Sequence, residues 1–251
     1  MRKLIFLGLL SVACWAADPV VVQNNNSTPC ETTNGSYTSI PQTGTCTLPG
    51  NVTAGNVIIA LIGARPNTTN TISSVATTRT GGYSQIVSSY TATSNSFGAE
   101  IWCGVVTSTG AEAAKVTYAA SIYYGHLFLA EVSGTNGCAQ DGTAVGAFAG
   151  SGANKAPGTI TTTRPNSILF NVAFNGASAA DMALTATYTQ IGLNNGDATY
   201  REAGAQFKVV SAGGYNPVIT GTSSGWGDVI MALQPASGGG TVQVRHKVTQ
   251  Q

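Results

Sequence analysis

The sequence predicts an all-β protein that folds as a single two-sheet antiparallel β-sandwich. No apolar stretch repeats with the 3.6-residue period of a helix, whereas short runs rich in Val, Ile, Thr, Tyr and Phe recur between Gly, Asn, Ser and Pro. Only 8% of the 251 residues are charged, while 43% are hydrophobic and 31 are glycine. This composition excludes a disordered chain or a coiled coil as the main state, because both are rich in charge.

A series of short runs stands out as predicted strands, and their number, with turns between them, is typical of a sandwich. The clearest are Val57–Ile62, Ile72–Thr77, Tyr83–Thr91, Ile101–Val106, Lys115–Tyr118, Leu127–Val132, Ile168–Phe174, Leu184–Ile191, Gln206–Val210, Val218–Thr222 and Val229–Leu233. Weaker candidates are Val20–Gln23, Tyr37–Ile40, Thr45–Leu48 and Thr159–Thr163.

The spacing of apolar residues indicates which predicted strands are half-buried and which are central. Ile101, Cys103 and Val105 alternate with polar or bulky neighbours, so they share one face of a half-buried strand. The runs Val57–Ile62 and Leu127–Ala130 are apolar on both faces. We therefore expect these two to lie in the middle of a sheet that is covered on both sides.

The first 16 residues have the features of a secretory signal peptide. Met1–Lys3 is positively charged, and Leu4–Ala13 is an apolar run shorter than the about 20 residues that span a membrane. Small residues predict cleavage after Ala16. Lipid attachment at Cys14 is the alternative, but Ser11–Ala13 do not match the lipoprotein pattern. We expect a secreted or cell-surface protein with no transmembrane segment in the mature chain.

The mature chain would hold four cysteines, Cys30, Cys46, Cys103 and Cys138. An even number in an exported protein predicts two disulfides, although four cysteines allow three pairings. Cys30 and Cys46 flank a turn-rich stretch, so their pairing is the easiest closure and would leave Cys103 to Cys138. A four-cysteine zinc site is the weaker alternative, because the chain has no Cys-x-x-Cys spacing.

No Pro- or Ser-rich linker interrupts the chain after the signal, so we expect one β-sandwich domain over residues 17–236. Residues 237–251 then form a glycine-rich joint and a C-terminal tail. Apolar residues and a histidine alternate in this tail with period two, at Val242, Val244, His246 and Val248. We expect a frayed terminus, because three valines bury too little area to hold a lone strand, and a strand that completes the sheet of another subunit is the alternative.

Three short segments stand out, namely Thr53–Ile59, Leu129–Gly134 and the stretch from Trp226 to Ala236. They resemble exported bacterial β-sandwich domains of the laminin-G/concanavalin-like jelly-roll type. The resemblance implies a jelly-roll-like sandwich on an extracellular or surface-anchored protein. It carries no catalytic residue, so it implies a fold and not an activity.

Residues suited to hydrolytic chemistry are scarce. The chain has two histidines, His126 and His246, and it lacks the Gly-x-Ser-x-Gly motif of serine hydrolases. Glu100 and Glu131 are the best pair for glycoside hydrolysis, which needs two carboxylates about 5 to 9.5 Å apart. They lie in separate predicted strands without a clustered acidic motif, and structural roles suit them equally. We therefore expect a protein that is not an enzyme, with cleavage of glycans as the third-ranked alternative.

Aromatic residues beside small or polar ones suggest a carbohydrate-binding surface, because sugar rings stack on Trp and Tyr. Trp226 is followed by Asp228 in Gly-Trp-Gly-Asp, and Tyr215–Asn216 precede it closely. Tyr123 and Tyr124 form a second group. For Trp226 the favoured expectation is that its side chain plugs one end of the sandwich as the last strand begins.

Charge and turn composition limit the partners. Without Arg2 and Lys3 the chain has nine basic and ten acidic residues, so no basic surface for nucleic acid is expected. No cofactor or metal is expected either, since Asp141–Thr143 and Asn194–Asp197 are ordinary turn sequences. The leading hypothesis is a non-catalytic protein for recognition, adhesion or carbohydrate binding. A structural subunit of an extracellular filament or coat, with another subunit as partner, is the alternative.

Overall fold

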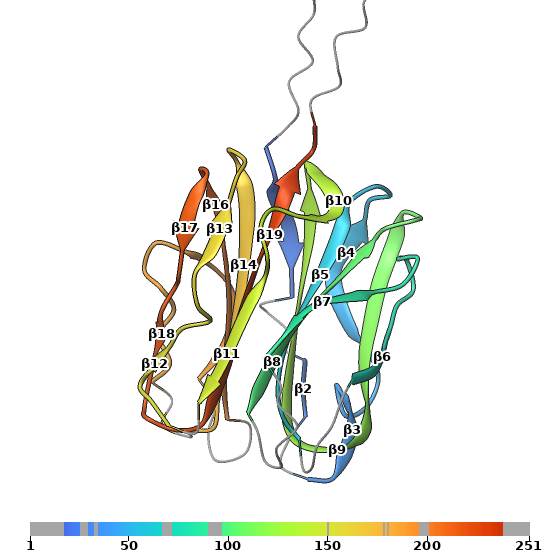
Figure 1. The fold of residues 1–251 in the computed structure, drawn as a ribbon. Helices are drawn as coiled ribbons and strands as arrows, with labels where there is room; N and C mark the ends of the chain where they lie inside the picture. Colours follow the sequence, from blue (N-terminus) through green and yellow to red (C-terminus); the bar gives the residue numbers. More distant parts are fainter. Residues whose placement is uncertain are drawn as a thin grey trace, which may run out of the picture.

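Every regular element of the described chain is a β-strand, and all paired strands run antiparallel. The computed structural model describes residues 18–25, 30–32, 35–66, 72–89, 97–149, 151–177, 179, 181–195 and 201–237. Two large sheets pack face to face, which confirms the predicted all-β sandwich (Figure 1). The predicted signal peptide and the alternating tail lie outside the described residues.

The first sheet is organised around one long strand, β9. Along its main path the order is β1 (Val20–Asn24), β9 (Gly110–Ser133), β5 (Val57–Pro66), β8 (Gly98–Val105) and β7 (Ser84–Ser88). Four further strands also pair with β9, namely β2 (Cys30–Thr32), β3 (Tyr37–Ile40), β4 (Cys46–Val52) and β6 (Ile72–Ala76).

The second sheet is built from the C-terminal half of the chain. Its order is β10 (Thr135–Gln140), β19 (Trp226–Pro235), β14 (Ser167–Asn175), β16 (Glu202–Val210) and β15 (Thr189–Asn195), and β11 (Val145–Ala149) also pairs with β19. Two short ribbons accompany this sheet. They pair β12 (Asn154–Lys155) with β18 (Ile219–Thr220), and β13 (Ile160–Thr162) with β17 (Gly213–Tyr215).

The main core lies between the two sheets. Side chains from alternate positions of β5, β8 and β9 meet those from β14, β16 and β19. Phe128 and Phe170 are among its largest fully buried members. Gly63 on β5 is required by this packing, since a Cβ atom there would lie 2.9 Å from the Cβ of Phe174.

Each sheet also buries its outer face, which explains why the central strands are apolar on both sides. The first half of β9, with β3, β4 and β6, folds over the outer face of β5 and encloses a second core (Figure 1). On the second sheet, the two short ribbons cover smaller apolar clusters around Leu169 and Met182. All nine residues of β14 are buried as a result.

Two disulfides link strands of this fold, and both predicted pairings are confirmed. Cys30 pairs with Cys46, with Cα atoms 5.6 Å apart, and so joins β2 to β4. Cys103 pairs with Cys138 at a Cα distance of 5.9 Å and links β8 of the first sheet to β10 of the second. Disulfides of this kind fit an oxidising, extracellular setting.

Several strand boundaries differ from those that the sequence predicts. Lys115–Tyr118 and Leu127–Val132 are parts of the single strand β9. The predicted strand Leu184–Ile191 is wrong in its first half, because β15 begins only at Thr189. Leu184 instead packs beside Met182 on the outer face of the second sheet.

Candidate functional site

The buried acidic residues hold loops in place. Both carboxylate oxygens of the fully buried Glu131 are occupied, Oε1 by the Thr53 amide at 2.8 Å and by Asn56 Nδ2 at 2.6 Å. Oε2 accepts from Gln23 Nε2 at 2.6 Å. Glu112 holds the turn around Arg79 in the same way, accepting from the Arg79 amide at 2.8 Å. Such carboxylates satisfy loop donors that would otherwise be buried without a partner.

Glu100 and Glu131 are not brought together as a pair. Glu100 pairs in register with Ile62 of β5 and Glu131 with Ile58, so their Cα atoms lie two strands and four residues apart, about 16 Å. Glu100 accepts from Trp102 Nε1 at 2.6 Å and from Gln85 Nε2 at 2.8 Å. Burial raises the pKa of Glu100, although these hydrogen bonds oppose the shift. Both residues are thus held by local partners.

Trp226 and Asp228 lie on the outer face of the second sheet and are enclosed. Trp226 is 8% exposed and Asp228 is fully buried. Asp228 accepts from Asn171 Nδ2, and burial raises its pKa well above the usual value for an aspartate. Enclosure of the indole leaves little of it for stacking on a sugar.

Tyr215 and Asn216 lie apart from Trp226, on the ribbon that covers the outer face. The Tyr215 hydroxyl donates to the Ser211 carbonyl at 2.8 Å, and Asn216 Oδ1 accepts from the Gly158 amide at 3.2 Å. Tyr215 packs in the same cluster as Tyr188, whose ring lies 5.4 Å from the Lys208 ammonium. Burial, and to a smaller extent the charge of Tyr215, raises the pKa of Tyr188 to about 12.

Tyr123 and Tyr124 lie at one end of the sandwich, where a β-bulge turns both side chains towards the space between the sheets. Arg65 pairs with Tyr124 and Pro66 with Ile122, so Tyr123 is the extra residue of the bulge. Successive residues of a regular strand point to opposite faces, and a bulge changes this. Tyr124 is part of the inter-sheet core, and the half-buried Tyr123 packs against the same core.

Two arginines stack on aromatic rings at this end of the sandwich. The Arg65 guanidinium carbon lies 5.2 Å from the ring centres of both Phe97 and Tyr123. The Arg201 guanidinium carbon lies 4.9 Å from the Tyr124 ring. Arg201 has a φ of 64°, an uncommon conformation for a residue with a side chain. We call Arg65, Phe97, Tyr123, Tyr124 and Arg201 the Arg-aromatic cluster.

A polar group adjoins this cluster. His126, two residues after Tyr124, is fully buried and has Nδ1 3.8 Å from Glu31 Oε1. Its ring stacks on Phe128 with ring centres 6.4 Å apart. Asn194 of β15, in the opposite sheet, donates to Glu31. This group therefore connects the two sheets with polar contacts.

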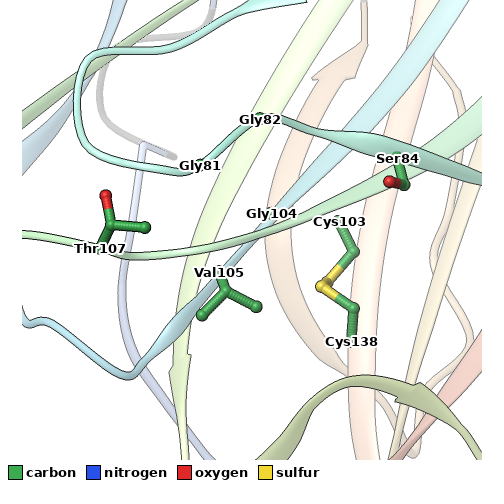
Figure 2. A pocket seen from close by; sticks show the side chains of 8 residues that line it. All are labelled: Gly81, Gly82, Ser84, Cys103, Gly104, Val105, Thr107 and Cys138. Carbon is green, nitrogen blue, oxygen red and sulfur yellow. A yellow bond between two sulfur atoms is a disulfide. The ribbon is translucent and has the colours of Figure 1, made fainter.

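A pocket of about 300 Å³ lies elsewhere, beside the disulfide between the sheets (Figure 2). Three glycines, two hydroxyl side chains and a valine form its wall with the cystine: Gly81, Gly82, Gly104, Ser84, Thr107, Val105, Cys103 and Cys138. None of the aromatic residues singled out from the sequence lines it. It offers no charged side chain to a ligand.

Across the described part of the chain, no group of three or more His, Cys, Asp or Glu side chains is placed to hold a metal ion. Among these residues there is also no helix long and apolar enough to cross a membrane. The sequence pattern indicated the two tyrosines of the cluster as candidate binding residues. It gave no signal for Arg65, Phe97 and Arg201, which are far apart in the chain and meet only in the folded sheets.

The protein is an antiparallel β-sandwich with two disulfides, and arginine side chains stack on aromatic rings at one of its ends. Comparison of the chain with protein-family models, with curated proteins and with solved structures gives no match.

Proposed function

We propose that the protein is an exported, non-catalytic recognition protein that binds carbohydrate at the cell surface through the Arg-aromatic cluster. The observation that carries this proposal is the position of the cluster. It lies at what we call the distal end, where β5 ends at Pro66, β14 ends at Asn175 and β19 begins at Trp226. β1 begins and β19 ends at the opposite end (Figure 1).

The position of the cluster, opposite the ends of the described chain, supports a binding role. A protein tethered through either end of the described chain would present the distal end outwards. Binding residues are commonly found near the ends of strands in a rigid scaffold, and three strands end here, at Pro66, Asn175 and Asn195. The predicted signal peptide and the two disulfides are consistent with export.

The chemistry of the cluster favours a sugar that carries acidic groups. Arg65 and Arg201 each have a buried Nε atom without a hydrogen-bond partner among the described residues. A guanidinium offers planar, paired donors to a carboxylate or sulfate group, while an aromatic ring packs against the apolar face of a pyranose. Tyr123 and Phe97 are half-buried and so retain accessible surface beside these donors.

The test is binding of the mature protein to an array of neutral and acidic glycans, followed by titration of the best binder. Tyr123→Ala removes one ring from Arg65, and we expect it to weaken binding about tenfold, as loss of about 1.4 kcal/mol would do. Tyr188→Ala, which removes a half-buried tyrosine from the outer face of the second sheet, is the matched control and should bind normally. Loss of binding in Tyr188→Ala alone would place the site on the outer face, and no binding to any glycan would refute the proposal.

A specific feature favours a structural subunit as the second candidate. β1 ends the path of the first sheet, and its Val20 and Val22 are 54% and 52% exposed. Exposed apolar side chains on a terminal strand can be covered by a strand from another copy. This candidate predicts oligomers that depend on the C-terminal tail.

A further inference from the structure

A lysine is completely buried under the cover of the second sheet. Lys155 lies on β12, in the ribbon that packs over the outer face of this sheet, and it has no exposed surface. Its Nζ donates to the backbone carbonyls of Ala153, at 3.1 Å, and Thr222, at 3.3 Å. No carboxylate of the described residues lies within ion-pair distance of it. Buried lysines are rare unless they are paired, so this one calls for an explanation.

The surroundings of Lys155 make its ammonium group easier to deprotonate. Burial lowers the pKa of the ammonium, and the charges of Glu202, Asp181 and Asp228 oppose this shift without cancelling it. A neutral amine is a nucleophile, and desolvation in an apolar site is one way in which proteins activate lysine. The ribbon and sheet here enclose an apolar cluster of Ala173, Met182 and Ile219.

An asparagine side chain shares a hydrogen-bond acceptor with this amine. Asn175 ends β14 and is fully buried. Its Nδ2 donates to the Thr222 carbonyl at 3.3 Å, the same oxygen that Lys155 Nζ contacts at the same distance. Nδ2 also donates to Glu202 Oε2, whereas Oδ1 has no partner among the described residues. The carboxamide is therefore held next to the amine and only partly satisfied.

We propose that Lys155 and Asn175 form an intramolecular isopeptide bond, with Glu202 as the proton carrier. The lone pair of Lys155 Nζ attacks Cγ of Asn175, and the new N–C bond replaces the bond from Cγ to Nδ2. Nδ2 leaves as ammonia, after taking a proton that Nζ releases and that the Glu202 carboxylate carries. Glu202 ends in its starting state, so the net change is the loss of one ammonia without any oxidant or cofactor.

The other buried asparagine on the same face of β14 is not placed for this reaction. Asn171 Nδ2 donates to Asp228 and, at 2.9 Å, to the Val229 carbonyl. Its Oδ1 accepts from Gln206 Nε2 at 2.7 Å, so the carboxamide is fully engaged. Asn175 thus differs from Asn171 in having a carboxamide oxygen without a partner among the described residues.

The bond would fasten the cover ribbon to the sheet. β12 and β18 have two residues each, so hydrogen bonds between them hold the ribbon only weakly. Lys155 belongs to the ribbon and Asn175 to the sheet, and a covalent bond between them closes the outer layer. This role is independent of any ligand at the distal end.

The first test is the mass of the exported protein after its disulfides are reduced. We expect it to be about 17 Da below the mass of the mature sequence, the mass of one ammonia. Trypsin should fail to cut after Lys155, and fragment spectra should place the loss at Lys155 and Asn175. A folded protein with both disulfides and the full sequence mass would overturn the proposal, whatever the variants show.

Variants then assign the roles. Lys155→Arg keeps a long basic side chain but removes the nucleophilic amine, and Glu202→Gln removes the proton carrier. We expect both to show the full mass and a lower melting temperature. Lys208→Arg, on the neighbouring β16, is the control and should keep the deficit. A deficit that persists in Lys155→Arg would refute the bond, and one that persists in Glu202→Gln would refute the role of Glu202. If either variant fails to fold, mass and tryptic mapping of the wild type decide alone.

Discussion

Asp141 shows how a single buried carboxylate fixes a turn. It accepts from the Thr163 hydroxyl at 2.7 Å and from the Arg164 amide at 3.0 Å, and also from the Ser167 hydroxyl. Burial alone would raise its pKa, but the hydrogen bonds from Ser167, Thr163 and Arg164 outweigh burial and lower it. In Asp228 the balance is opposite, since burial dominates and raises the pKa.

The lowered pKa of Asp141 has a consequence for acid stability. An unfolded aspartate titrates near pKa 3.9, so the ionised Asp141 stabilises the fold above about pH 4, and this contribution is lost as the pH falls through its lower folded pKa. We expect Asp141→Asn to lower the free energy of unfolding by about 2 kcal/mol at neutral pH, and by less in acid. Urea unfolding across this pH range measures the difference.

Asp18→Asn is the control for this experiment, because the Asp18 hydrogen bond to Asn166 is exposed. Its effect should be small at every pH. A loss of stability in Asp141→Asn that does not shrink in acid would show that the hydrogen bonds, and not the charge, account for the contribution.

Individual strands show what sequence pattern can predict and where it fails. β5 contains the run Val57–Ile62, which is apolar on both faces, and this pattern correctly predicts a strand buried on both sides. The sequence predicts two strands where the structure has the single strand β9, whose middle from Ala119 to Gly125 has no regular alternation. The bulge at Tyr123 accounts for part of this irregularity. Local patterns also cannot predict which distant strands become neighbours, and the meeting of Arg65 with Phe97 depends on such neighbours.

One disulfide lies within a sheet and the other joins the two sheets, and the two should differ in how much they stabilise the fold. Cys30–Cys46 closes 16 residues within the first sheet, whereas Cys103–Cys138 closes 35 residues and joins the two sheets. Replacing each pair by alanine should cost about 3 kcal/mol for the first and about 4 kcal/mol for the second, because the longer loop gains more entropy when opened. Urea unfolding of both double variants measures this. Equal or reversed losses would show that strain or residual structure, and not loop length, controls the stability.

The described molecule consists of stacked layers with both chain ends at one side. The cover formed by the first half of β9, the two sheets and the short ribbons follow one another across the sandwich (Figure 1). Val20 pairs with Ser133 and Pro235 with Thr135, so the first and last strands flank one turn. The Ala236 amide still donates to the Gly134 carbonyl at 2.8 Å.

This arrangement predicts the effect of removing the tail. A chain that ends after Ala236 retains the contact with Gly134, so we expect its melting temperature to change by less than about 2 °C. If the tail joins copies, the same truncation abolishes oligomers in size-exclusion chromatography. A large fall in the melting temperature of the monomer would instead mean that the tail pairs within its own sandwich.

The central position of β9 also determines when the chain can fold. Six strands pair with β9, and all six precede it in the sequence, from Val20 to Ala76. None of them can complete its pairing until Gly110–Ser133 has been synthesised, so the first sheet has many contacts of high sequence separation. Until then the apolar β5 can pair only with β8, and its other edge is open to aggregation. Such delayed folding keeps the early chain unfolded, and an unfolded chain is the state that the export proposed above requires.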